Sequence, residues 1–210
     1  MPKGLTKKRD ARLGAILDAA TALFTGKGYE ATTVDKILEA VQMGKGTFYH
    51  YFKSKEEVLA TVVDRLIARA VERVAAIAAN PDLDAIAKVR RAVRVVNIAN
   101  SADGGIVQEL HRPANRAMRQ KSVGETIRQV APVMARIVEQ GVAEGVYSTP
   151  NPLATVEFLL AANQAILDVG GPEVPPERLA ARAAEAVRIT ELALGVKAGA
   201  FAFLLHEEAR

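Results

Sequence analysis

The sequence predicts an all-α protein, and three observations carry that prediction. Apolar residues recur at helical spacing along nearly all of the 210 residues, and no segment alternates polar and apolar residues as a strand does. Ala, Leu and Val supply most of the apolar residues, while aromatic residues make up only 5%, which favours helices over β-sandwiches. Half of the chain is hydrophobic, enough for a sizeable core without structural disulfides or metal.

The first predicted helix carries its apolar residues on one face and ends at Gly26-Lys27-Gly28, because glycine offers a C-terminal cap. Thr32 or Thr33 can cap the next helix, with Asp35 in its first turn. The apolar face of the first helix consists of Leu13, Ile16, Leu17, Ala20, Leu23 and Phe24.

A capping box at Ser54, with Glu57 three residues later, opens a long helix that ends at Asn80-Pro81. Further helices are predicted over 83–100, 106–144 with a kink near Pro132, 153–169 and 176–194, followed by a tail helix to about 208. We expect a first domain at 1–54 and a larger second domain at 55–210, linked mechanically by the helix that starts at Ser54.

The basic residues are concentrated at the N-terminal end. Residues 1–55 hold ten basic and five acidic side chains, a net charge of +5, whereas the other 155 residues together carry −1. A basic end on a neutral body indicates a polyanionic partner for that end, although a solvated basic tail would give the same pattern.

The chain contains no Cys, which excludes disulfides, thiolate zinc sites and a cysteine nucleophile, and suits a reducing compartment. Asp18 interrupts the apolar run that a signal peptide would need, and no stretch reaches about 18 uninterrupted apolar residues. We therefore expect a soluble, cytoplasmic protein.

Residues 32–55 have the pattern of a helix-turn-helix. A helix of about eight residues, 34–41, is followed by a turn at 42–44 and a second short helix over 45–51. Such a second helix enters the major groove of DNA, while flanking groups hold phosphates. The residues expected to fix the angle between the two helices are Ile37, Val41, Met43, Phe48 and Phe52.

The DNA contacts expected from chemistry lie on and around this second helix. Lys45 and Lys55 supply positive charge for phosphates, and Lys45 can also contact the edge of a guanine. Gly46 lets the helix backbone come close to the DNA. Tyr49 and His50 offer rings with polar tips, although packing or plain exposure would also explain them. The full predicted set is Thr33, Lys45, Gly46, Thr47, Tyr49, His50 and Lys55.

The segment 12–60 resembles the N-terminal domain of the TetR family of bacterial regulators. The matching residues are Phe24, Gly28, Tyr29, Thr32-Thr33-Val34, Ile37, Lys45-Gly46-Thr47-Phe48-Tyr49, Tyr51-Phe52, Lys55 and Leu59. The stretch 139–147 is also similar to one that is common in the family's C-terminal domain. The departures from the family pattern are Leu38 and Val41 in place of small alanines, Gln42 in place of a glycine, and Gly44 in place of a serine.

The resemblance implies a homodimer that binds a palindromic operator and responds to a small, mostly apolar organic effector, most simply as a repressor released by that effector. The helices at 153–169 and 176–194 would form the dimer interface, in which Gln164 is expected, while Asn163 suits either interface or pocket. The predicted effector-binding set is Val96, Asn97, Asn100, His111, Met118, Met134, Phe158 and Asn163, with Val93, Gln108, Leu110, Asn115, Ile137 and Glu157 as further candidates.

We expect no catalytic residues, cofactor or metal. The three histidines, His50, His111 and His206, are far apart and form no metal-binding pair, and there is no Walker loop, nucleophile elbow or dinucleotide fingerprint. Two alternatives remain open: a sequence-indifferent architectural DNA-binding protein without effector, and a small-molecule-binding protein with a degenerate DNA-binding head. Effector, operator and target genes are not readable from these residues.

Overall fold

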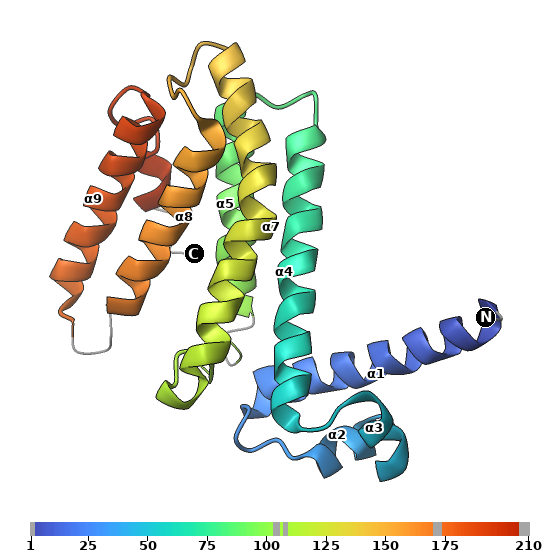
Figure 1. Ribbon diagram of the computed structural model, residues 1–210. Coiled ribbons are helices and arrows are strands. Elements are labelled where there is room, and N and C mark those ends of the chain that lie inside the picture. The colour runs from blue at the N-terminus through green and yellow to red at the C-terminus, as the bar shows by residue number, and fades with distance from the viewer. Residues whose placement is uncertain (1–2, 103–105, 107–108, 170–173, 206–210) are drawn as a thin grey trace. The chain divides into compact units, whose positions relative to one another are not determined.

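The computed structural model describes residues 3–102, 106, 109–169 and 174–205; the side chains of residues 3–8, 97–102, 113, 167–169 and 176 lie outside this description. All regular elements in these residues are helices, which confirms the predicted fold class (Figure 1). None of the helices described is both long enough and apolar enough to span a membrane.

The helices agree closely with the predicted ranges. They are α1 (Lys3–Lys27), α2 (Val34–Ala40), α3 (Lys45–Tyr51), α4 (Lys55–Ala79), α5 (Ala85–Ala102), η1 (Pro113–Asn115), α7 (Arg116–Ala143), α8 (Pro152–Val169), α9 (Pro176–Leu194) and η2 (Ala202–Leu205). Two predictions need correction. The predicted helix over 106–144 is broken by the 3₁₀ turn η1, where Pro113 lacks the N–H that a continuous helix needs, and then runs through Pro132. The predicted tail helix is the 3₁₀ turn η2, and residues 206–210 lie outside the description.

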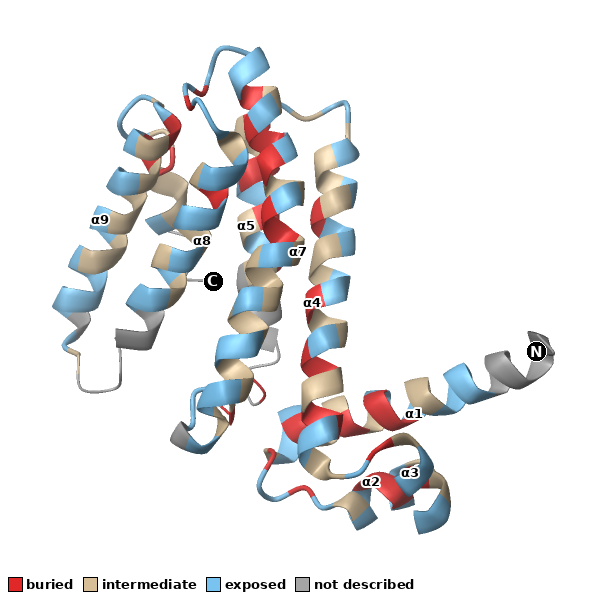
Figure 2. Cartoon of the chain, viewed as in Figure 1, coloured by how far each residue is buried: buried red, intermediate tan, exposed pale blue. Residues whose placement is uncertain are grey.

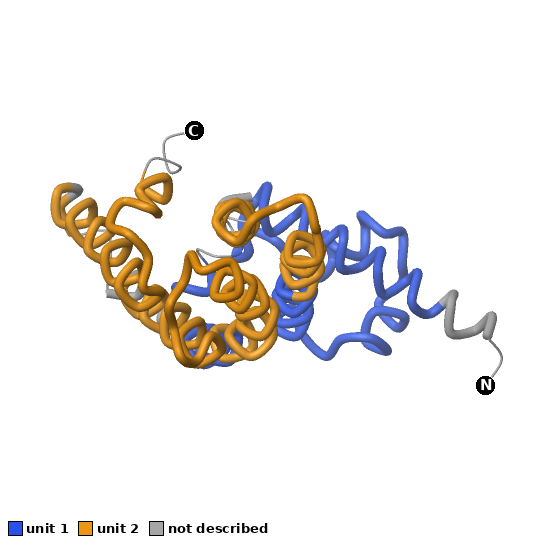
Figure 3. Tube along the Cα trace, turned by 90° about the horizontal axis from the view of Figure 1, so that it is seen from above, with its two compact units in different colours: residues 1–67, 99–122 blue, residues 68–98, 123–210 orange. Residues whose placement is uncertain are grey.

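The chain folds as two compact units (Figure 3). Unit 1 comprises residues 1–67 and 99–122, and unit 2 comprises residues 68–98 and 123–210. The division within α4 lies thirteen residues beyond the predicted boundary at 54, because the first half of α4 contacts α1, as in the ion pair between Arg65 and Asp18. Unit 1 also includes residues 99–122, which the prediction placed in the second domain. Because α4 belongs to both units, it connects them covalently as one helix.

In unit 1, the predicted caps determine where the helices begin and end. Gly28 has a φ of 84° and its N–H donates to the carbonyl oxygen of Phe24 at 3.1 Å, so that α1 ends where the glycines predicted it. Ser54 Oγ accepts from the N–H of Glu57 at 3.2 Å, which confirms the cap of α4. Buried segments are red in Figure 2. The buried hydrophobic residues of this unit include Ile16, Leu17, Ala20, Phe24, Tyr29, Ile37, Leu38, Phe48, Phe52, Val58, Leu59, Val62, Val63, Ile67 and Ile106.

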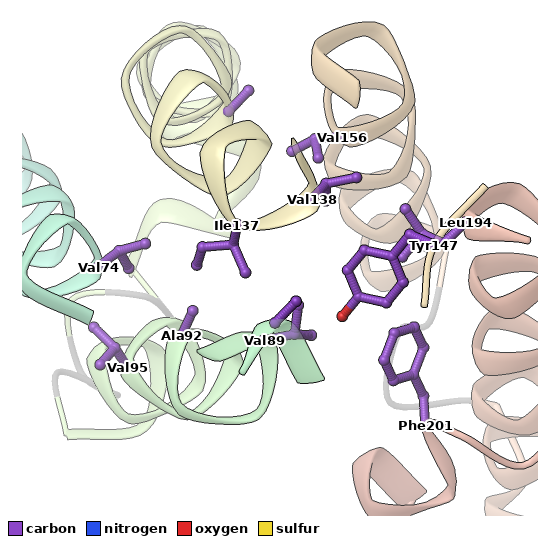
Figure 4. Packing of buried hydrophobic residues seen from close by; sticks show 12 residues of the cluster. Val74, Val89, Ala92, Val95, Ile137, Val138, Tyr147, Val156, Leu194 and Phe201 are labelled. Carbon is purple, nitrogen blue, oxygen red and sulfur yellow. The ribbon is translucent and has the colours of Figure 1, made fainter. Parts of the chain in front are cut away.

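Unit 2 has its own apolar core, to which α4, α5, α7, α8 and α9 all contribute (Figure 4). Tyr147 packs edge-on to Phe201 with ring centroids 6.2 Å apart. Gly141 makes room for Tyr147, because a Cβ at Gly141 would lie 2.1 Å from the tyrosine ring. The core residues labelled in Figure 4 are Val74, Val89, Ala92, Val95, Ile137, Val138, Tyr147, Val156, Leu194 and Phe201.

Two buried charged side chains in unit 2 satisfy backbone groups at helix ends. Lys88 Nζ donates to the carbonyl oxygen of Ala78, in the last turn of α4, and to Gln140 Oε1, both at 2.6 Å. The Glu191 carboxylate accepts the N–H groups of Gly199 at 3.0 Å and Phe201 at 2.8 Å. Both residues are therefore structural, since buried charges are stable only when they are hydrogen-bonded.

Candidate nucleic-acid interface

The helix-turn-helix begins at Thr33, whose Oγ1 accepts from the N–H of Lys36 at 3.3 Å and so caps α2. Its neighbour Thr32 is fully buried, and Thr32 Oγ1 donates to the carbonyl oxygen of Gly28 at 2.8 Å. The two adjacent threonines thus have different roles: Thr32 fixes the turn after α1, and Thr33 starts α2 with its side chain exposed.

The turn between α2 and α3 contains a residue in the left-handed conformation that is not a glycine. Gln42 has a φ of 51° and is the one non-glycine residue with positive φ in the described chain. The N–H of Met43 donates to the carbonyl oxygen of Leu38 at 3.0 Å, which closes the turn. The turn therefore keeps the geometry that a glycine would adopt, and Gln42 bears a strain of about 1 kcal/mol.

The second helix, α3, separates its aromatic residues into two groups. Phe48 is fully buried and Phe52 is 3% exposed, and the two rings pack with centroids 5.8 Å apart. Tyr49 is 57% exposed, and its ring meets the edge of Phe48 at 5.5 Å. As predicted, Phe48, Phe52 and Ile37 form the core, with Val41 and Met43 half-buried at its margin.

The outward face of α3 presents most of the predicted DNA-contacting residues together. Lys45, Gly46, Tyr49 and His50 are exposed, and Thr47 is half-buried. Apart from its chain neighbours and the backbone of its own helix, no heavy atom would lie within 4 Å of a Cβ added at Gly46, so that the backbone there is open to a close approach. Gly44 precedes the helix in an extended conformation and, as the residue type dictates, provides no side-chain cap.

The charged groups around α3 are partly engaged within the chain. Lys45 Nζ lies 2.9 Å from Asp35 Oδ1 and 3.3 Å from Asp35 Oδ2. The hydrogen bond and the charge of Asp35 raise the pKa of Lys45 above its usual value. Lys36 Nζ donates to the carbonyl oxygen of Ala31 at 2.6 Å. The sequence pattern did not reveal the pairing of Lys45 with Asp35, because it depends on the angle between α2 and α3.

Lys55, predicted as a phosphate ligand, is turned inward. Its Nζ donates to the carbonyl oxygen of Tyr29 at 3.0 Å and lies 4.0 Å from the centroid of the Tyr29 ring. Lys55 thus joins the start of α4 to the turn after α1. Lys53, which was not among the predicted contacts, is exposed just beyond α3 and adds a cationic side chain at this end of the motif.

A small cavity of about 280 Å³ lies beside Tyr29 in unit 1. Burial raises the pKa of Tyr29 above its usual value, and the neighbouring carboxylates add to the shift. Arg112 Nη1 lies 2.5 Å from Glu30 Oε1 and 3.5 Å from Glu109 Oε2. The lining residues are Lys27, Gly28, Tyr29, Glu30, Ala31, Glu109 and Arg112, none of which belongs to the predicted effector set.

The predicted effector-binding residues are not gathered in one described cavity. Val96 and Met134 are half-buried in unit 2 and Met118 is half-buried in unit 1. His111 is exposed in unit 1, while Asn163 and Phe158, the latter 65% exposed, lie on the outside of α8. The side chains of Asn97 and Asn100, and residue Gln108, lie outside the described residues. A second hollow of about 410 Å³, beside Arg90, Arg91 and Arg94 of α5, contains none of the set.

An apolar face is exposed on α8 and α9. Phe158 and Leu192 are each 65% exposed, the most exposed large hydrophobic side chains in the described chain. Gln164 is half-buried beside this face. The other exposed large hydrophobic residues on these two helices are Leu153, Ile166, Leu179 and Ile189.

Comparison with known proteins agrees with these features. Residues 16–62 match the family model of bacterial regulatory proteins of the tetR family, and residues 97–182 match the tetracyclin repressor-like C-terminal domain. The HTH-type transcriptional regulator YhgD of Bacillus subtilis is 28% identical over 164 residues, which is 77% of this chain and 85% of that protein.

Solved structures show the same architecture over nearly the whole chain. A TetR/AcrR-family regulator from Thermobifida fusca is 27% identical with a TM-score of 0.59, and the match covers 95% of this chain and 100% of that one. RolR, solved in complex with resorcinol, shares the fold at 18% identity with a TM-score of 0.64, covering 98% of this chain and 96% of that one.

These relatives are transcriptional regulators and not enzymes. The two family models together match residues 16–62 and 97–182 of the chain. The helix-turn-helix at α2–α3 and the matches of both family models thus identify the chain as a member of the TetR family of transcriptional regulators.

Proposed function

We propose that this protein is a ligand-responsive repressor that binds a palindromic operator as a homodimer in the cytoplasm. The observation that carries the proposal is the outward face of α3, where Lys45, Gly46 and Tyr49 are exposed while Phe48 anchors the helix from behind. A short helix anchored on one side and polar, cationic and open on the other suits insertion into a major groove.

The proposed DNA contacts are Thr33, Lys45, Gly46, Thr47, Tyr49 and His50, with Lys53 added as a phosphate ligand. Lys55 is removed from the direct contacts, because its ammonium is occupied by Tyr29. Its proposed role is to hold the start of α4 against the turn that precedes α2, which keeps the head in one arrangement.

The homodimer is proposed to form through the exposed apolar face of α8 and α9. Phe158 and Leu192 would be buried against a second copy, and each fully buried side chain of this kind contributes about 1.5–3 kcal/mol. A twofold dimer places two α3 helices on one duplex, which doubles the contacts and fixes the spacing of the half-sites. Phe158 is therefore assigned to this interface in place of the effector pocket.

The effector is proposed to be a small, mainly apolar organic molecule that binds in unit 2 near Val96 and Met134. The fold neighbour RolR, which holds resorcinol, supports a ligand of this size. Because α4 runs from unit 1 into unit 2, an effector that prefers one arrangement of unit 2 would shift α4 and the head attached to it. The affinity for the operator would then fall by a factor set by how much more tightly the effector binds the shifted arrangement than the DNA-binding one.

The test is a binding titration of the full chain with duplexes selected from a random pool, followed by competition with unselected DNA. We expect the selected duplex to bind about 10³-fold more tightly than random duplex. Equal affinities would contradict the proposal and indicate sequence-indifferent binding.

Two variants locate the binding site in the same titration. Lys45→Ala and Tyr49→Ala should each weaken binding to the selected duplex by about tenfold or more, whereas Arg136→Ala on α7, exposed, in unit 2 and outside the proposed dimer surface, should not. Unchanged affinity in both head variants would instead indicate a degenerate head.

A further inference from the structure

The ion pair between Asp35 and Lys45 joins the two helices of the DNA-binding motif. Asp35 lies in the first turn of α2 and Lys45 is the first residue of α3, ten residues later. The ammonium lies within 2.9 and 3.3 Å of the two carboxylate oxygens, so that it contacts both. Both side chains are 68% exposed, and neither is covered by other residues of the chain.

The pair contributes little to folding but much to the surface charge. An exposed ion pair of this kind typically adds less than about 1 kcal/mol to stability. An acidic residue suits the first turn of α2, where the helix dipole attracts negative charge. The Lys45 ammonium, from α3, lies against this carboxylate.

We propose, on the basis of the proposed function, that Asp35 is a specificity-determining residue. It holds the Lys45 ammonium in an ion pair and so lowers the affinity of the protein for DNA of arbitrary sequence. Phosphates are the same in every duplex, so a free ammonium at the front of α3 would add affinity without discrimination. Paired with Asp35, the ammonium already has an acceptor, which a phosphate of a random duplex must displace.

A matched duplex overcomes this restraint because the remaining contacts of α3 bring it closer. Exposed Tyr49 and open Gly46 allow α3 to enter the groove fully only when the base edges fit. The phosphate or guanine edge then replaces Asp35 as the acceptor for Lys45. The loss of the ion pair is thus compensated in specific complexes and remains a penalty in nonspecific ones.

The experiment compares wild type with Asp35→Asn for two probes, a random-sequence duplex and the duplex selected by the wild-type chain. For random duplex, Asp35→Asn should tighten binding about three- to tenfold at 50 mM salt, with a salt slope steeper by about 0.9 for one additional phosphate contact. The selected duplex should gain less, so that the specificity ratio falls. An unchanged affinity for random duplex, or an equal gain for both probes, would overturn the proposal.

Glu39→Gln provides the matched control. Glu39 is an exposed carboxylate on the same helix, and its substitution changes the net charge by the same amount. We expect less than a twofold effect on random duplex. If Glu39→Gln equals Asp35→Asn, the effect is one of net charge and the proposed restraint of Lys45 is wrong.

A double-mutant cycle shows whether Asp35 acts through Lys45. In a Lys45→Gln background, Asp35→Asn should lose most of its gain for random duplex, whereas simple repulsion of phosphates would leave the gain intact and contradict the restraint. Circular dichroism and Tm should be unchanged in both variants, because the pair is exposed. If the wild-type chain shows no preference for any selected duplex, the proposed function is wrong. The comparison of wild type with Asp35→Asn on random duplex still tests whether Asp35 restrains Lys45.

Discussion

Two surfaces of this chain expose large side chains, and they differ in their chemistry. On α3, Tyr49 is 57% exposed beside Lys45 and His50, each of which carries polar groups. On α8 and α9, Phe158 and Leu192 are 65% exposed, and Leu153, Ile166, Leu179 and Ile189 are exposed as well. The first surface offers mainly hydrogen bonds and charge, whereas the second offers a large apolar area.

The difference indicates two kinds of partner. A polyanion such as DNA gains from cations, polar ring tips and an open backbone, and it gains nothing from exposed leucine. A second copy of the chain gains from the apolar area, because removing it from water is favourable. We therefore propose that the α3 surface binds DNA and that the α8–α9 surface forms the dimer, and the following substitutions test that assignment.

The largest effect is expected for Phe48→Ala, compared with Tyr49→Ala one residue along. Because Phe48 is fully buried, its truncation should lower the free energy of unfolding of the head by about 3–5 kcal/mol. Tyr49→Ala should change it by less than about 1 kcal/mol and weaken DNA binding instead. Urea denaturation with parallel DNA titration separates the two. Similar destabilisation by both substitutions would mean that Tyr49 belongs to the core.

The next effect concerns the apolar surface. Phe158→Glu, and separately Leu192→Glu, should raise the dimer dissociation constant about 100-fold or more, because an unpaired carboxylate is costly to bury. Analytical ultracentrifugation measures the change, and Tyr49→Ala should remain dimeric as the control. A dimer that persists in both variants would place the interface elsewhere on the chain.

Gly46→Ala tests the open backbone of α3. The added methyl group meets nothing within 4 Å in the free protein, and alanine is about 1 kcal/mol better than glycine inside a helix, so that stability should rise slightly. DNA affinity should nevertheless fall about tenfold, since the methyl group would stand between the backbone and the duplex. Unchanged affinity would show that DNA does not approach α3 at this position.

Gln42→Gly should give the smallest effect, a gain of up to about 1 kcal/mol in the free energy of unfolding. The substitution relieves the left-handed strain at a φ of 51°, partly offset by the greater freedom of glycine in the unfolded chain. The urea midpoint measures it. A loss of stability would mean that the Gln42 side chain makes a favourable contribution larger than the strain.

Much of the fold follows from local signals in the sequence. Thr33 and Ser54 cap helices through their own hydroxyls, and Gly28 ends α1 through its positive φ. Each of these depends on residues within four positions, so that pattern and propensity suffice to place them. At Gln42 the sequence left two outcomes open, a different turn or a strained residue, and the structure has the left-handed residue with a φ of 51°.

The candidate site was less predictable because its details depend on tertiary packing. Lys45 and Lys55 are both lysines flanking α3, yet one lies exposed against Asp35 and the other is turned inward onto Tyr29. Their partners lie ten and twenty-six residues away, and only the angles between helices decide which side chains meet. Phe158 was unpredictable for the same reason. The apolar sequence of its helix indicates that the helix faces are covered, but it does not indicate whether a second chain or a ligand covers them.

The assignment of the two surfaces is tested most directly by the duplexes that the full chain selects from a random pool, together with the number of chains bound per duplex. Two α3 helices related by a dimer axis predict an inverted repeat with half-site centres about one helical turn or a multiple apart, bound by an even number of chains. Enrichment of a single unrepeated element bound by one chain, or no enrichment at all, would contradict the assignment.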